Sequence, residues 1–170
     1  MKKYLLSALF VFAASSIFGQ MKTTGVVLFG GGVSFTSSKA EGADKASTKF
    51  NITPSVGFFA APALALGVNL DFESYQVPGL SRINTNAAGP FARVYFDSSR
   101  TIFGFGEYTY RFAKDSKGNE LSGGLGLSFG VTKSTALEPA IYYKSSKGDF
   151  FEGTEIGFRM GLQVYLGKDR

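Results

Sequence analysis

The chain has 170 residues, of which 44% are hydrophobic and only 18% are charged, and its formal net charge is +5. The charged fraction is below the roughly 25% that is usual in soluble domains. The sequence contains no Cys and no His. The absence of Cys excludes disulfides, thiolate metal sites and a lipid-anchored N-terminal cysteine. No run of basic residues is present, so we expect no nucleic-acid partner.

The first residues have the three parts of a secretory signal peptide. Lys2 and Lys3 form a positively charged start, residues 5–14 form a short apolar run, and Gly19 is a small residue before the expected cleavage site. The apolar run is too short for a membrane-spanning helix, which needs about 20 residues. We therefore expect residues 1–19 to be removed and residues 20–170 to form one exported domain; cleavage after Ser16 is the alternative.

The rest of the chain shows no 3.6-residue period and no long apolar window. Apolar residues alternate with other residues instead, which predicts β-strands. Eight strands are expected, at residues 24–36, 48–59, 63–75, 87–97, 101–113, 120–132, 135–145 and 153–167. Each is long enough to cross a membrane at a tilt, which takes about 9–11 residues. In the fifth strand, Phe103 and Phe105 are out of phase with Tyr108, which predicts a β-bulge there.

The connections between these strands alternate in length. Longer polar links are expected at residues 37–46, 76–85, 114–119 and 146–153, and tight turns at 60–62, 98–100 and 133–135. In an up-and-down barrel, this rhythm places the long links at one end and the short turns, with both termini, at the other. Short periplasmic turns and longer external loops are typical of outer-membrane barrels.

The last expected strand raises the question of which face is buried. Its apolar residues are Ile156, Phe158, Met160, Leu162, Val164 and Leu166, and Arg159 lies among the residues of the opposite face. A soluble barrel would turn the apolar face inward, whereas a membrane barrel would turn it toward lipid. The composition of the opposite face in all eight strands decides between these two alternatives.

Glycine and serine dominate that opposite face, and its few charges are balanced. The basic residues are Lys49, Arg93, Arg111, Lys144 and Arg159; the acidic residues are Asp71, Glu73, Asp97, Glu107 and Glu138. A water-exposed face would carry many more charges. A narrow lumen instead requires small side chains and paired charges. We therefore expect the apolar face to contact lipid and the charged residues to form a structural ion-pair network in the lumen.

Aromatic residues near the expected strand ends suit the interfacial girdles of a membrane barrel. They are Tyr75, Phe96, Phe112, Tyr143 and Tyr165.

These features together resemble the small outer-membrane β-barrel superfamily, the group around outer-membrane proteins X and W and the barrel domain of A. The resemblance covers nearly the whole mature chain and includes "LEPAIYYK" (137–144) and the closing "GLQVYL" (161–166). It implies an all-β, eight-stranded antiparallel up-and-down transmembrane barrel. Such a barrel is monomeric, has periplasmic termini and is inserted into the outer membrane of a Gram-negative bacterium by the assembly machinery. This chain departs from the family by continuing past Leu166 to Arg170, where relatives usually end on an aromatic residue.

No catalytic or cofactor motif stands out. The enzymes known among small membrane barrels depend on a histidine, which this chain lacks. The G-x-G stretches at 104–106 and 124–126 are explained by strand alternation, because no helix follows them. Glu107 and Glu138 are candidate acids or bases, but we expect them to serve as ion-pair partners. We expect no cofactor and no bound metal.

Three functions remain open at this stage. The main expectation is a non-enzymatic outer-membrane protein with a plugged lumen, which acts structurally or through surface partners that bind the four longer links. An alternative is a narrow pore or a lateral path for a small or hydrophobic solute, suggested by the many lumen glycines. A second alternative is a soluble lipocalin-like binder in the periplasm.

Overall fold

The computed structural model describes residues 26–38, 46–76, 78–79, 81–113, 116–148 and 152–167. Its regular elements are strands: β1 (Val27–Ser38), β2 (Ser47–Ala61), β3 (Leu64–Gln76), β4 (Ile83–Tyr95), β5 (Ile102–Ala113), β6 (Ser116–Leu127), β7 (Phe129–Gly130), β8 (Thr135–Gly148) and β9 (Glu152–Leu166). Within these ranges, no helix has the length and apolar character that crossing a membrane would require. The expected signal peptide and its cleavage site lie outside the described residues.

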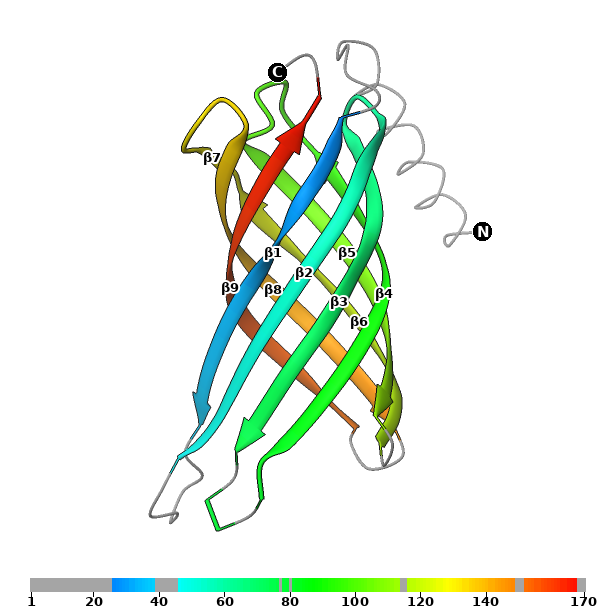
Figure 1. Ribbon diagram of the computed structural model, residues 1–170, viewed down its shortest axis with the longest axis vertical. Coiled ribbons are helices and arrows are strands. Elements are labelled where there is room, and N and C mark those ends of the chain that lie inside the picture. Colours follow the sequence, from blue (N-terminus) through cyan, green and yellow to red (C-terminus); the bar gives the residue numbers. More distant parts are fainter. Residues whose placement is uncertain are drawn as a thin grey trace, which may run out of the picture.

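The strands form one closed antiparallel sheet (Figure 1). β1 to β6 pair in sequence order, β1 also pairs with β9, β9 pairs with β8, and pairing of β8 with β6 closes the circle. The two-residue β7 continues β6, because Gly126 pairs with Ala140 and Phe129 pairs with Leu137, three residues further along both strands. The expectation of an eight-stranded antiparallel barrel is therefore confirmed, with its sixth strand interrupted at Ser128.

The connections at the two ends of the barrel differ less in length than the sequence predicts. The turn end carries the connections 62–63, 96–101 and 131–134, together with the start of β1 and the end of β9. The strand bounds leave 39–46, 77–82, 114–115 and 149–151 at the other end, so the expected regular alternation of long and short links is wrong. At the opposite end, which we call the loop end, the strands extend further than predicted. Parts of the expected links at 37–46, 76–85, 114–119 and 146–153 belong to strands. Polar composition does not end a strand here, because polar cross-strand neighbours such as Lys147 and Glu152 continue the ladder.

The bulge expected in the fifth strand is absent. The register between β4 and β5 is constant from the pair Tyr95 and Phe103 to the pair Phe91 and Glu107. Phe103 and Phe105 are buried in the lumen, so their phase is the regular inward phase of β5. The prediction was wrong because it assigned every apolar side chain to the outer face. The register shifts instead between Phe59 and Ala61, where β2 pairs with β3.

The outer surface of the barrel is apolar along every long strand. In β9, Ile156 is 83% exposed and Phe158 is 55% exposed. Leu162 and Leu166 are also exposed on this face, and Met160 and Val164, which share their phase, are half-buried. The six apolar residues of the last strand therefore point away from the lumen.

The buried core of the protein is the lumen itself. At the turn end it contains a cluster of aromatic side chains, Phe59, Tyr95, Phe103 and Tyr165, with exposed fractions of 5% or less. Tyr165 was expected in an outer aromatic girdle, and that expectation is wrong because Tyr165 has the inward phase of β9. Phe96, Phe112 and Tyr143 are exposed, while Tyr75 shares the inward phase of Glu73 on β3.

Inward aromatic residues lie opposite glycines on the neighbouring strand. The cross-strand pairs are Phe91 with Gly67, Phe103 with Gly126, Phe105 with Gly124, and Tyr142 with Gly157. In each case a Cβ added to the glycine would overlap the aromatic ring. The lumen glycines thus make room for large side chains, which fill the space that the glycine-rich pattern leaves open.

This packing predicts unequal effects of two similar substitutions. In Gly126→Ala the new methyl group collides with the Phe103 ring, and overpacking of this kind costs about 1–3 kcal/mol. Gly106→Ala is the matched control, because nothing lies within 4 Å of a Cβ at Gly106 on the outer surface. We expect the heat-induced unfolding midpoint, measured by the gel shift of the folded band, to fall for Gly126→Ala only. Equal midpoints would show that the glycine is not needed for the fit.

Asp97 lies in the turn between β4 and β5, and its expected place in the lumen network is wrong. Its carboxylate accepts hydrogen bonds from the backbone N–H of Thr101, at 2.8 Å and 3.0 Å, and of Ile102, at 2.8 Å. Next to it, Arg100 has φ of 55°, a left-handed conformation that the turn imposes. Partial burial opposes ionisation, but the Ile102 and Thr101 amides lower the pKa of Asp97 below its usual value.

A lowered folded-state pKa means that ionised Asp97 stabilises the turn above the unfolded pKa of about 3.9. This contribution is lost as the pH falls through the lower folded-state pKa. We expect Asp97→Ala to lose about 1 kcal/mol at pH 7 and the difference from wild type to shrink below pH 4. Urea unfolding at a series of pH values measures this. A difference that stays constant from pH 7 to pH 3 would contradict the role of the charge.

Candidate functional site

The candidate site is the polar interior of the barrel, which strand alternation builds. Residues at every second position of a strand point to the same side, so the inward positions of β2, β3, β4, β5, β6, β8 and β9 converge on a narrow lumen. Ion pairs there form three groups along the axis, and the aromatic cluster lies at the turn end.

The first ion pair lies against the aromatic cluster. Arg93 Nη1 is 2.5 Å from Glu138 Oε2, and the Tyr165 hydroxyl donates to Glu138 Oε1 at 2.6 Å. The Tyr95 and Tyr165 hydroxyls are 3.0 Å apart, and the Arg93 guanidinium lies 4.4 Å from the centre of the Phe103 ring. Each charge therefore has an opposite charge, hydroxyl partners or a ring face, which offsets the cost of burial.

The second ion pair crosses the middle of the lumen. Arg159 donates to both carboxylate oxygens of Glu107, at 2.7 Å and 3.0 Å, and Ser122 donates to the same carboxylate. The guanidinium lies 3.9 Å from the centre of the Phe105 ring. A two-pronged arginine–carboxylate pair fixes geometry as well as charge, so this contact holds β9 to β5 across the barrel.

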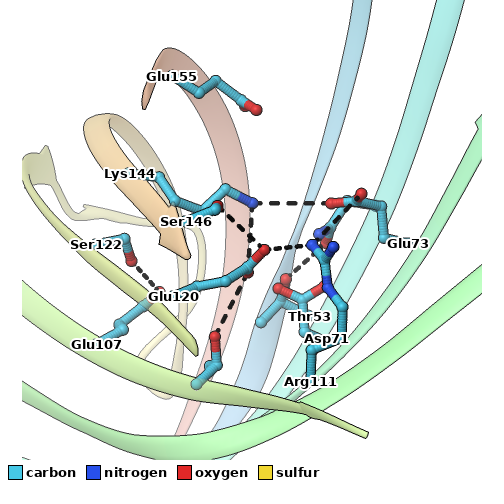
Figure 2. A network of polar contacts seen from close by, with 12 residues as sticks. Thr53, Asp71, Glu73, Glu107, Arg111, Glu120, Ser122, Lys144, Ser146 and Glu155 are labelled. Atoms are coloured by element: carbon cyan, nitrogen blue, oxygen red, sulfur yellow. Dashed lines mark hydrogen bonds and ion pairs between the residues drawn. The ribbon is translucent and has the colours of Figure 1, made fainter. Parts of the chain in front are cut away.

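The third group, at the loop end, is a branched network (Figure 2). Glu120 pairs with Arg111 and lies 3.6 Å from Lys144, and Ser146 donates to it at 3.3 Å. Glu73 lies 3.0 Å from Lys49 and 3.7 Å from Lys144. Five strands meet in this network, so it ties together the end of the barrel where the connections are longest.

Two further acidic residues complete the loop end. Glu155 is 2.7 Å from Lys49 and accepts a hydrogen bond from Tyr142 at 2.6 Å. Asp71 makes no ion pair within 4 Å among the described residues, and it accepts a hydrogen bond from Asn51 at 2.6 Å.

Nine of the ten charged residues expected in the lumen point inward, and Asp97 is the exception. The nine are Lys49, Asp71, Glu73, Arg93, Glu107, Arg111, Glu138, Lys144 and Arg159, and all except Asp71 make an ion pair. The sequence reasoning missed Glu120 and Glu155, although their positions share the phase of Ser122 and Arg159. With these two added and Asp97 removed, the lumen contains five basic and six acidic residues, so the balance is not exact.

Two small cavities remain between these groups. One, of about 30 Å³, is lined by Asn69, Arg93 and Gln163, and the other, of about 40 Å³, by Ser34, Asp71 and Tyr142. The pair Arg159 and Glu107 borders both. A water molecule needs about 10–15 Å³ of such volume, so each cavity has room for only a few waters. In the first cavity, Asn69 Oδ1 and Arg93 Nε lack protein hydrogen-bond partners, so a water molecule there could bond to both.

No arrangement for covalent or metal chemistry appears among the described residues. None of them forms a group of three metal-ligating side chains. The lumen hydroxyls of Ser122, Ser146 and Thr109 contact carboxylates without a neighbouring general base of the histidine type. The arrangement can hold strands together and bind polar groups.

Comparison with solved structures shows the same architecture. The crystal structure of Neisserial surface protein A is similar, with a TM-score of 0.57 and 16% identity over 82% of this chain and 94% of that one. A chain described as a de novo designed transmembrane β-barrel has a TM-score of 0.51 and 12% identity over 86% of this chain and 100% of the designed one. No protein-family model and no curated protein matches the sequence. At these identities the likeness shows the fold of a transmembrane eight-stranded barrel.

The central ion pair provides a direct test of what holds the lumen together. We expect Arg159→Met to lower the free energy of unfolding by about 3 kcal/mol, because Glu107 is left buried without its partner. Arg159→Glu should cost more, since it places two carboxylates together. The double variant Arg159→Met, Glu107→Gln removes both charges and should lose less than Arg159→Met alone. The measurement is urea unfolding of the folded barrel in detergent. Unchanged stability in Arg159→Glu would contradict a structural role for the pair.

Proposed function

We propose that this protein is a non-enzymatic integral outer-membrane barrel whose lumen is closed by its own side chains. Its role is structural or depends on partners that bind the loop end. The proposal rests on three groups of side chains that block the lumen one after another along its axis. They are the aromatic cluster, the pair Arg93 and Glu138, and the pair Arg159 and Glu107. The two cavities described above, each with room for a few waters, lie between them.

The inverted distribution of side chains supports a place in the membrane. A soluble barrel keeps its apolar residues inside, whereas here the charges are inside and the large apolar residues are exposed. Residues 156–166 advance about 33 Å along the strand, which is about 25 Å along the barrel axis at a tilt of roughly 40°. This rise matches the apolar band of a membrane barrel. Large apolar side chains are exposed on every long strand, whereas a soluble monomer rarely exposes a contiguous apolar patch of more than a few hundred Å².

The same features favour a closed barrel over a pore. Abundant lumen glycines suggested an open channel, but the glycines at 67, 124, 126 and 157 are covered by aromatic rings. A conducting path would require Arg159 to leave Glu107 and the aromatic cluster to separate. Both rearrangements oppose buried ion pairing and ring packing.

A surface role is supported by the two ends of the barrel. The start of β1 and the end of β9 lie at the turn end, as expected for the periplasmic side. The loop end then faces outward, and the longer links at 37–46, 76–85, 114–119 and 146–153 are the candidate contact regions. The similar Neisserial protein is named a surface protein, which agrees with this orientation.

Two measurements test the proposal. We expect the protein to remain in the outer-membrane fraction after carbonate washing and to shift on a gel when heated. In planar bilayers, the purified wild-type barrel should give no openings above background. Phe59→Ala, Phe103→Ala, which removes two rings of the aromatic cluster, serves as the comparison and should pass more current if it folds. Steady ion-selective openings of the wild type would overturn the closed barrel, and release by carbonate would overturn the membrane location.

A further inference from the structure

The seam between the first and last strands is only partly closed. β1 and β9 pair from Val27 with Leu166 to Val33 with Met160, and among the described residues no pairing continues beyond that point. Ser34–Ser38 of β1 still pairs with β2, and the region 152–159 of β9 still pairs with β8. In Figure 1, β1 and β9 run side by side at the turn end and diverge toward the loop end. We call this gap the seam opening.

The seam opening begins within the apolar belt. Phe35 on one edge is 66% exposed, and Ile156 and Phe158 on the other edge are 83% and 55% exposed. If the ladder continued in register, Phe35 would face Phe158. Unpaired backbone groups are not tolerated against lipid tails, but they are tolerated where they border a polar cavity. The seam opening therefore needs a polar group behind it.

The larger cavity lies directly behind the seam opening. Val33 and Ser34 of β1 line it on one side, and Arg159 of β9 lines it on the other. Tyr142 also lines this cavity, where its ring occupies the space that Gly157 leaves free on β9. Ser34 and Tyr142 line this cavity together, one from β1 and the other from β8. The lumen and the outer surface are thus separated here by side chains rather than by a continuous backbone ladder.

The contacts that close the gap form a carboxylate-binding arrangement. The Lys49 amine lies 2.7 Å from the Glu155 carboxylate, and the Tyr142 hydroxyl donates to the same carboxylate at 2.6 Å. Amine and phenol donors converging on one carboxylate make strong, charge-assisted hydrogen bonds. In the present structure the chain's own Glu155 occupies this arrangement. Another carboxylate takes its place when the Glu155 side chain, which is 26% exposed, turns away to solvent; the charge beside Lys49 is then the same.

We propose that the seam opening is a lateral binding site for single-chain carboxylate amphiphiles, the fatty acid class. The carboxylate displaces Glu155 from Lys49 and Tyr142, and the hydrocarbon chain stays in the membrane against Phe35, Ile156 and Phe158. The cavity of about 40 Å³ is lined by Tyr142 and not by Lys49 or Glu155, so the bound head lies beside this cavity, at the place that Glu155 vacates. The inference rests on the membrane location proposed above and adds a ligand to the closed barrel.

The width of the seam is tested first, with cysteine pairs in a chain that has no native Cys. Val33→Cys, Met160→Cys joins two paired positions, and Ser37→Cys, Ile156→Cys joins the corresponding positions beyond the last pair. Disulfides require Cα atoms within about 7 Å. We expect mild oxidation to cross-link the first pair efficiently and the second poorly. Equal cross-linking of both pairs would show a closed seam and overturn the proposal.

Ligand binding is tested in zwitterionic nanodiscs by titration with dodecanoate, using dodecanol as the probe without a charged head. We expect dodecanoate to bind more tightly than dodecanol. Lys49→Gln should weaken dodecanoate binding about tenfold or more, because it removes a charge-assisted hydrogen bond. Glu155→Gln should strengthen it, because it removes the competing carboxylate. Lys147→Gln is the matched control, since this lysine lies on the outward phase of β8 near the same end.

The heat-shift assay on each nanodisc sample separates this proposal from the previous one. If the barrel is inserted but dodecanoate binds no better than dodecanol, the lateral site is overturned and the membrane location stands. If Lys49→Gln fails to fold, the comparison of Glu155→Gln with wild type decides. Equal dodecanoate affinity of Glu155→Gln and wild type would also overturn the site. So would a folded Lys49→Gln variant whose dodecanoate binding is weakened no more than that of Lys147→Gln.

Discussion

The rest of this structure depends on closing a backbone ladder into a ring. A strand that crosses lipid has no water to satisfy its N–H and C=O groups, so each of its two edges needs a neighbouring strand. Antiparallel pairing in sequence order supplies these neighbours from β1 to β6, and the pairing of β6 with β8 and of β9 with β1 completes the ring. Once the ring is closed, side-chain alternation leaves only two environments. One face is a wide outer surface, and the other is a lumen that eight strands keep narrow.

The narrow lumen explains why polar and aromatic groups interlock inside. A buried charge is stable only with a partner, and a large ring fits only where its neighbour is small. Both conditions are met here. Arg159 donates to both carboxylate oxygens of Glu107 across the lumen, and the Phe103 ring fills the space over Gly126 on the adjacent strand. The glycine-rich face therefore belongs to a filled interior, which is the opposite of the open channel that glycine abundance suggests when one strand is considered alone.

The strand pattern and the inward phase of the charges could be predicted from the sequence, because both depend on the two-residue period. What depends on register could not be predicted in this way. Phe103 and Tyr165 are apolar or aromatic residues on the inward phase, and their burial follows from glycines and hydroxyls on other strands. Asp97 has the same phase as the lumen residues, but it lies in a tight turn, where its carboxylate accepts hydrogen bonds from two backbone N–H groups. Glu120 and Glu155 were missing from the expected lumen network although they have the inward phase. The two-residue period was therefore sufficient to predict their place in the lumen.

Register also determines where this barrel differs from a generic one. A designed barrel with 12% identity has a similar fold, so the fold alone specifies no activity. Properties particular to this chain must come from departures from the regular ladder, and the largest described departure is the early end of pairing between β1 and β9. At that point the backbone no longer separates lumen from surroundings, and Lys49, Glu155 and Tyr142 take over this task. Because side chains exchange partners far more readily than a hydrogen-bonded ladder opens, the seam is where an otherwise closed barrel can respond to a ligand.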